Sequence, residues 1–125
     1  MSYVYFNPNP SELSVGDCVI RAISKLTNLT WEQVYIELMV LGFMMCDMPS
    51  ANRVWDEFLQ RKGYKRKFIP NTCPNCYTVK DFCNDYPRGK YLLATGSHVV
   101  TIVDGNYYDS WDSGNEILMY YYERE

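Results

Sequence analysis

Histidine is nearly absent from this sequence, because His98 is the only one in 125 residues. The chain also has no excess of positive charge, with a net charge of −3 and a pI near 5.1. This balance gives no reason to expect a nucleic acid or an anionic membrane as the partner. One basic run at residues 61–67 is the exception, and we interpret it as solvated charge at a helix end and a strand edge.

Long apolar runs are missing as well: none approaches the roughly 20 residues that a transmembrane helix needs. Residues 1–8 do not place a basic stretch before an apolar one, so we expect no signal peptide. The five cysteines are an odd number, which does not suit a framework of paired disulfides. We therefore predict a cytoplasmic protein with reduced thiols and no membrane partner.

Hydrophobic residues make up 47% of the chain, enough to bury one core without help from disulfides. A chain of 125 residues fits one domain of ordinary size, which we assign to residues 1–125. Helical periodicity runs through the first half. The expected helices begin at Asp17, Thr30 and Pro49 and end near Asn28, Gly42 and Gly63.

Strand-like alternation replaces the helical pattern in the second half. The expected strands cover residues 64–69, 90–95, 97–103, 106–110 and 117–122, and a short helix covers 78–83. Asp104 and Gly105, between two of these strands, are a strong signal for a two-residue hairpin turn. Helices first and strands afterwards predict an α+β domain in which N-terminal helices pack on a C-terminal antiparallel β-sheet.

Three reactive groups are distributed over these two halves. Cys18 opens the first expected helix, His98 opens an expected strand, and Asp109 lies on the following strand. A thiol, an imidazole and a carboxylate are the parts of a cysteine nucleophile with its base and the residue that orients the base. The helix start favours a thiolate, and the Cys18 N–H there is a candidate donor to the oxyanion of a tetrahedral intermediate.

The hairpin register tests whether His98 and Asp109 can meet. A two-residue turn pairs Val103 with Asn106 and makes Asp109 the diagonal neighbour of His98. One face of the hairpin then carries His98, Val100, Asp109 and Trp111. Asp112 points the other way, and a three-residue loop would reverse this choice. We therefore predict that Asp109, not Asp112, orients His98.

These residues resemble the papain-like cysteine peptidases. The resemblance is carried by Gly16-Asp17-Cys18, by His98, and by Asp109-Ser110-Trp111-Asp112 where that family commonly has Asn-Ser-Trp-Gly. The compact NlpC/P60, CHAP and transglutaminase-like relatives share the same Cys–His–polar order. Residues 17–22 are also similar to an Asp-Cys-Val-x-Arg-Ala stretch of small bacterial and phage proteins of this type.

The resemblance implies a papain-like fold and a cysteine hydrolase, either a peptidase or an amidase. Such an enzyme acts on a peptide or protein substrate through an acyl-enzyme on Cys18 and needs no cofactor. The family places a glutamine before the nucleophile as a second oxyanion donor, but here Glu12 stands in that stretch, and an ionised carboxylate cannot donate.

Another residue must then supply the second hydrogen bond to the oxyanion. Asn7 and Asn9 are candidate donors, provided that the N-terminal segment folds back over the cleft, and Trp111 is a candidate substrate contact. The missing glutamine also favours an alternative, in which the chain is a catalytically inactive papain-like module that binds a protein partner.

The remaining cysteines suggest a third possibility. Cys73 and Cys76 have the CxxC spacing that suits zinc or a redox pair, and Cys83 follows seven residues later. A zinc-stabilised interaction domain would be centred on these three residues. A single CxxC without a matching second pair favours a reduced, packed loop without metal instead. Cys46 is interpreted as a core or cleft-lining residue.

Overall fold

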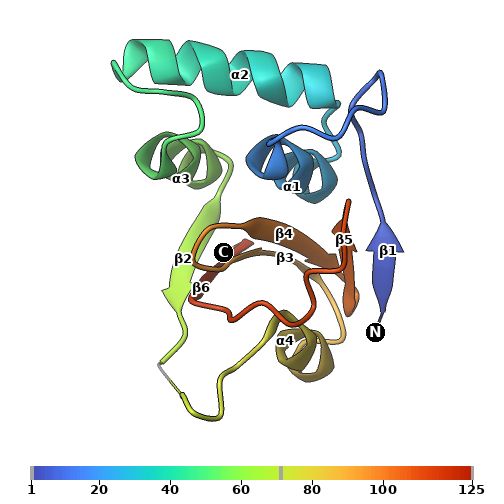
Figure 1. Cartoon of the computed structure of the whole chain (residues 1–125). Helices are drawn as coiled ribbons and strands as arrows, with labels where there is room; N and C mark the ends of the chain where they lie inside the picture. The colour runs from blue at the N-terminus through green and yellow to red at the C-terminus, as the bar shows by residue number, and fades with distance from the viewer. Residues whose placement is uncertain (1, 71, 125) are drawn as a thin grey trace.

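The computed structural model describes residues 2–70 and 72–124 (Figure 1). Within them lie four helices: α1 (Cys18–Thr27), α2 (Trp31–Met44), α3 (Asn52–Arg61) and α4 (Val79–Asp85). The strands are β1 (Tyr3–Tyr5), β2 (Tyr64–Phe68), β3 (Lys90–Ala94), β4 (Val99–Val103), β5 (Asn106–Asp109) and β6 (Tyr120–Arg124). They form one six-stranded sheet in the order β1-β5-β4-β3-β6-β2. The predicted α+β class is confirmed.

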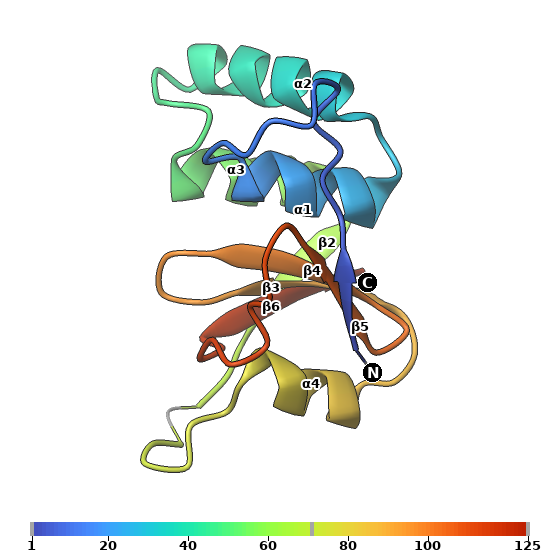
Figure 2. The ribbon, with the colours of Figure 1, turned by 45° about the vertical axis from the view of Figure 1, so that its right-hand side comes forward.

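Helices cover both faces of this sheet. Figures 1 and 2 show α1 and α3 above the sheet, α2 lying over these two helices, and α4 below the sheet. Neighbouring strand residues point alternately into the two layers: Leu92 and Tyr122 belong to the core on the α1–α3 side, whereas Leu93 and Tyr121 belong to the core on the α4 side. Alternate residues of these strands therefore contribute to two separate hydrophobic cores, one on each face of the sheet.

The helix caps follow local sequence. Thr30 and Gln33 form the predicted capping box of α2, and Asn28 ends α1 in the left-handed conformation, with a φ of 61°. The predicted end of α2 is wrong, because the helix continues through Gly42 to Met44. A Cβ on Gly42 would lie 2.9 Å from the Asp47 carbonyl oxygen, so this glycine admits the following loop and does not stop the helix.

The N-terminal segment changes the nature of the sheet. Sequence patterns indicate only an extended stretch there, but β1 pairs in parallel with β5, so the sheet as a whole is mixed. The antiparallel prediction holds for β2 to β6 and fails only at β1. The pairing also fixes the end of β5. The Phe6 N–H and the Tyr3 hydroxyl both donate to the Asp109 carbonyl, at 2.8 and 3.1 Å.

The predicted hairpin register is confirmed. Val103 pairs with Asn106, and positive φ values of 48° at Asp104 and 78° at Gly105 make the two-residue turn. The prediction that Val100 shares a face of the hairpin with His98 and Asp109 is wrong. Val100 packs into the α4-side core, whereas Asp109 contacts Arg21 of α1. His98 lies just before β4 and Asp109 ends β5, so strand alternation does not govern their side chains.

A buried hydrogen bond fixes α1 against the sheet. The Thr101 hydroxyl of β4 donates to the Ala22 carbonyl of α1 at 2.6 Å, and both residues are buried. Because the Ala22 carbonyl belongs to the helix interior, this bond sets how far α1 extends past the start of β4. The first turn of α1 is thereby placed beside the residue that precedes β4.

None of the four helices in residues 2–70 and 72–124 combines the length and the apolar character that a membrane crossing demands.

We expect Gly105→Ala to lower the free energy of unfolding by about 1–2 kcal/mol, because an L side chain is strained in the left-handed region. Its φ is 78°, and its Cβ would lie 3.4 Å from the Cys83 carbonyl oxygen. Urea denaturation followed by circular dichroism measures the change.

Gly96→Ala is the matched control, since Gly96 lacks a positive φ and its Cβ would meet only the Met119 sulfur, at 4.0 Å. Equal losses in the two variants would contradict a turn held by the backbone conformation of Gly105.

Candidate active site

Two chain segments bring Cys18 and His98 together. Cys18 is the first residue of α1, as predicted, and His98 is the last residue of the β3–β4 loop, directly before β4. The Thr95 N–H and hydroxyl both donate to the His98 carbonyl, at 2.8 and 3.1 Å. The loop is therefore closed at its base, and the backbone of His98 is fixed.

The half-buried Cys18 thiol is hydrogen-bonded to the His98 ring. Burial raises the pKa of this thiol, but hydrogen bonds from His98 and the Val99 N–H, with the charges of His98 and Arg21, outweigh burial and lower the pKa below its ordinary value. Cys18 therefore favours the thiolate more strongly than a cysteine in water does.

His98 is held on its other side by Asp109. The His98 Nε2 lies 2.6 Å from the Asp109 Oδ2, which leaves Nδ1 as the ring nitrogen for the thiol. Burial lowers the pKa of His98, but the hydrogen bonds and opposite charges of Asp109 and Cys18 overcome this and raise it to about 9. The imidazolium form is thus favoured at neutral pH.

Asp109 is fully buried yet surrounded by donors. Burial raises its pKa. The hydrogen bonds from His98 and the Ser113 hydroxyl, with the charges of His98 and Arg21, lower the pKa by more than burial raises it, so the pKa lies below its usual range. Arg21 donates to Oδ1 at 2.9 Å, Ser113 to Oδ2 at 2.6 Å, and the Ser110 N–H to Oδ1 at 2.8 Å. Each carboxylate oxygen is therefore satisfied in its ionised form.

Arg21 links this carboxylate to a second one. Its guanidinium donates to the Asp17 Oδ1 at 2.6 Å, and the Trp31 indole N–H donates to the Asp17 Oδ2 at 2.8 Å. The Arg21 side chain is 5% exposed, so a buried cation joins two buried carboxylates. Since Trp31 begins α2 and Asp109 ends β5, the chain of contacts ties α1, α2 and the sheet to one guanidinium.

The same contacts leave the start of α1 without a side-chain cap. Asp17 occupies the N-cap position, as predicted, but makes no capping hydrogen bond, because Arg21 and Trp31 engage its oxygens. The first-turn N–H groups, including that of Cys18, are therefore not satisfied by the cap residue. Together with the helix dipole, such N–H groups favour an anion at this end of the helix.

A cleft of about 610 Å³ adjoins Cys18 and His98. Its walls come from the first turn of α1, α2, the loop between α2 and α3, the β3–β4 loop, and the start of β6. Because a thiol and its hydrogen-bonded imidazole are both part of the lining, a molecule bound in the cleft can reach the sulfur.

Two of the predicted substrate contacts lie elsewhere. Asn7 donates to the Leu13 carbonyl at 3.2 Å, and Asn9 accepts from the Ser11 N–H at 2.9 Å. Neither lines the cleft, because these amides stabilise the N-terminal loop itself, so the prediction of Asn7 and Asn9 as oxyanion donors is wrong. Trp111 does lie beside His98, with ring centroids 4.6 Å apart, but outside the cleft lining.

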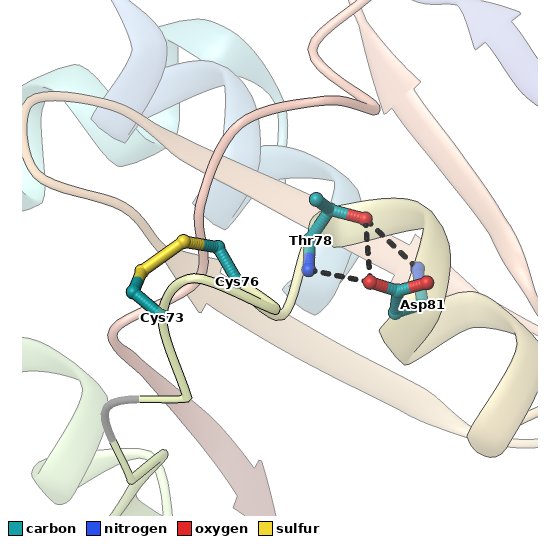
Figure 3. Close-up of a disulfide and its surroundings, with 4 residues drawn as sticks. All are labelled: Cys73, Cys76, Thr78 and Asp81. Atoms are coloured by element: carbon teal, nitrogen blue, oxygen red, sulfur yellow. Dashed lines mark hydrogen bonds between the residues drawn. A yellow bond between two sulfur atoms is a disulfide. The ribbon is translucent and has the colours of Figure 1, made fainter.

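The other cysteines are placed differently from the prediction. Cys73 and Cys76 form a disulfide in the loop before α4, next to the Thr78–Asp81 capping box (Figure 3). This overturns the expectation of reduced thiols there and removes the cysteine argument for a cytoplasmic location, which stays a prediction. Cys46 is exposed and not a core or cleft residue.

A zinc site at Cys73, Cys76 and Cys83 is excluded by this arrangement. The first two sulfurs are bonded to each other, and Cys83 is buried in the α4-side core, where burial raises the pKa of its thiol to about 11. Among the residues that the structure describes, no group of three or more His, Cys, Asp or Glu side chains is placed to hold a metal ion.

Sequence reasoning missed the residues that support the candidate triad. Arg21, Trp31 and Ser113 received no role, and Asp17 was expected to cap a helix. One signal was available, because Asp17 and Arg21 stand four residues apart and therefore on one helix face. The contacts with Trp31 and Ser113 are set by packing and have no comparable signal.

Comparisons of the chain with protein-family models, with curated protein sequences and with solved structures find no match.

We expect iodoacetamide to modify Cys18 faster than Cys46 and Cys83 at pH 6, because the thiol pKa of Cys18 is lowered, whereas that of the buried Cys83 is raised. A lowered pKa keeps thiolate present below the ordinary value, and the rate should fall only as the pH drops through the lowered pKa. Mass spectrometry of peptides across a pH series measures the three rates.

His98→Ala should remove this advantage and move the Cys18 profile to higher pH, while Cys46 in the same protein serves as the exposed reference. Equal slow modification of the three free cysteines would contradict a stabilised thiolate.

Arg21→Gln should lower the free energy of unfolding by about 3–5 kcal/mol, because two buried carboxylates lose their cation. Arg61→Gln is the matched control: its ion pair with Glu57 is exposed, and such pairs contribute at most about 1 kcal/mol. Urea denaturation of both variants gives the comparison. Similar small losses would show that Arg21 does not bridge the carboxylates in solution.

Proposed function

We propose that this protein is a papain-like cysteine hydrolase that cleaves an amide bond in a peptide or protein through an acyl-enzyme. The observation that carries the proposal is the chain of contacts from the Cys18 thiol through the His98 ring to the buried Asp109 carboxylate. This set contains a nucleophile, an acid–base group and a residue that orients it, in an open cleft. The helices packed on a sheet and the order Cys, His, Asp along the chain support the family assignment.

The first half of the reaction forms a thioester. The Cys18 thiolate attacks the substrate carbonyl carbon, and the carbonyl π electrons move to the oxygen, which accepts from the N–H groups at the start of α1. The intermediate then collapses as the carbon–nitrogen bond breaks. The His98 imidazolium gives its proton to the departing amine, so that an acyl group remains on Cys18 and His98 becomes neutral.

The second half hydrolyses this thioester. Neutral His98 takes a proton from a water molecule, whose oxygen bonds to the acyl carbon. The resulting intermediate expels the Cys18 thiolate and releases a carboxylic acid, which restores the thiolate and imidazolium. Asp109 accepts from Nε2 throughout, which keeps Nδ1 directed at the thiol and stabilises the positive ring.

Arg21 acts on this reaction indirectly as a positioning residue. Its guanidinium fixes one oxygen of Asp109 and leaves the other for His98 and Ser113. The carboxylate is thus prevented from rotating as the charge on the ring changes. Positioning of this kind reduces the reorganisation that the transition state requires.

A catalytically inactive module that binds a protein partner is the second candidate. The observation that favours it is the position of Asn7 and Asn9, whose side chains serve the N-terminal loop and supply no amide donor to the oxyanion. Such a module would retain the cleft and bind a peptide segment without cleaving it.

We expect p-nitrophenyl acetate to acetylate Cys18 in a burst of one p-nitrophenolate per protein, followed by slower turnover. An activated ester needs less acid catalysis than an amide, so it tests the nucleophile separately from the oxyanion donors. Intact-mass spectrometry identifies the acetyl group, and absorbance follows the released phenolate.

Cys18→Ala should abolish the burst, and His98→Ala should slow it by about a hundredfold, because the Cys18 thiolate loses the imidazolium that stabilises it. Cys46→Ala is the matched control, because Cys46 lies outside the cleft. A burst that persists in Cys18→Ala, or no burst in the wild-type chain, would favour the inactive module.

A further inference from the structure

The cleft beside Cys18 has a lining that selects among substrates. We propose that it binds a peptide segment with large, uncharged, apolar side chains next to the carbonyl that Cys18 attacks. This inference rests on the proposed function and adds its substrate class.

Three methionines from separate elements give the cleft its apolar surface. Met39 comes from α2, Met48 from the α2–α3 loop and Met119 from the residue before β6, and all three line the same cleft. They are about half exposed or more, at 46%, 67% and 52%, although they are apolar. Unbranched thioether side chains adapt to irregular apolar groups, so they suit side chains of varied shape.

The methionine walls are built into the fold. Gly42 lets the loop after α2 approach the helix closely, and Arg53 donates to the Asp47 carboxylate at 2.6 Å and to the Met45 carbonyl at 2.7 Å. These contacts hold the loop that carries Met48. The Met119 N–H, directly before β6, donates to the Ala94 carbonyl of β3 at 2.9 Å. The backbone around Met48 and Met119 is therefore anchored by hydrogen bonds.

The charge of the lining excludes ionised side chains. Apart from the paired Cys18 and His98, Asp17 is the only Asp, Glu, Lys or Arg among the described residues that line the cleft, and it is already paired with Arg21. A charged substrate side chain would lose water there without gaining a partner. An apolar side chain loses nothing and gains from burial against the methionines.

A polar rim favours a peptide over a lipid chain. Ser50, Asn52 and Ser97 line the same cleft, and all three are polar residues. Asn52 accepts from the Trp55 indole N–H at 3.1 Å, and its Nδ2 has no hydrogen-bond partner within the described residues. A peptide supplies a carbonyl for this donor at regular intervals, whereas the hydrocarbon part of a lipid supplies none.

The test uses a matched series of electrophiles with one reactive group. Acetylated dipeptidyl fluoromethyl ketones carrying Leu-Leu, Gly-Gly, Asp-Asp or Lys-Lys are incubated with the full chain, together with decanoyl fluoromethyl ketone. The Cys18 sulfur bonds to the methylene carbon, and fluoride leaves with the electron pair of the carbon–fluorine bond. Intact-mass spectrometry gives each second-order rate relative to that of iodoacetamide.

The Leu-Leu probe should react at least tenfold faster than the Gly-Gly probe, and faster than the Asp-Asp, Lys-Lys and decanoyl probes. Met48→Glu should reduce the Leu-Leu rate at least tenfold and raise the Lys-Lys rate, because a carboxylate enters the apolar wall. Met44→Glu is the matched control, since Met44 is 65% exposed on the same helix–loop segment but lies outside this cleft. Its rates should equal those of the wild-type chain.

The possible failures are distinguishable. If iodoacetamide does not modify Cys18 selectively, the proposed function fails, and this inference fails with it. If iodoacetamide is selective but the dipeptidyl probes react equally, the substrate class is wrong and the hydrolase proposal stands. A decanoyl probe that reacts faster than the Leu-Leu probe would overturn the choice of a peptide, and equal effects of Met48→Glu and Met44→Glu would overturn the assignment of the cleft.

Discussion

The arrangement of this protein depends on one buried cation. Arg21 contacts one carboxylate at the N-cap of its own helix and another at the end of β5, and through Asp17 it is connected to the first residue of α2. A buried charge of either sign is strongly unfavourable alone, so each member of this group requires the others. The consequence is positional: the start of α1, where Cys18 lies, is fixed relative to Asp109 and therefore to His98.

The same contacts determine the protonation of the candidate site. Asp109 stays ionised in a fully buried position because four donors share its oxygens, and its charge favours the imidazolium form of His98. The imidazolium in turn lowers the pKa of Cys18. The Asp17 side chain does not cap α1, because its oxygens accept from Arg21 and Trp31. The N–H groups of the first turn are therefore available to an anion. The positions of these side chains and their protonation thus have a common electrostatic origin.

Much of the fold could be predicted from local sequence. The capping box at Thr30 and Gln33, the left-handed Asn28 and the Asp104-Gly105 turn are signals that short stretches carry by themselves, and the structure has all three. The end of α2 was mistaken because Gly42 accommodates a loop that comes after it, which a helix signal does not reveal. The parallel pairing of β1 with β5 joins residues over a hundred positions apart, and no local pattern specifies it.

The sequence by itself indicated the three candidate residues, and the turn chemistry of the hairpin set the register that places Asp109 near His98 along the strands. Only the tertiary structure decided that Asn7 and Asn9 stay in their own loop, that Cys73 and Cys76 pair, and that Arg21 bridges two carboxylates. The physical reason is the range of the interactions. Turns and caps depend on neighbours along the chain, whereas burial and ion pairing depend on which distant segments exclude water together.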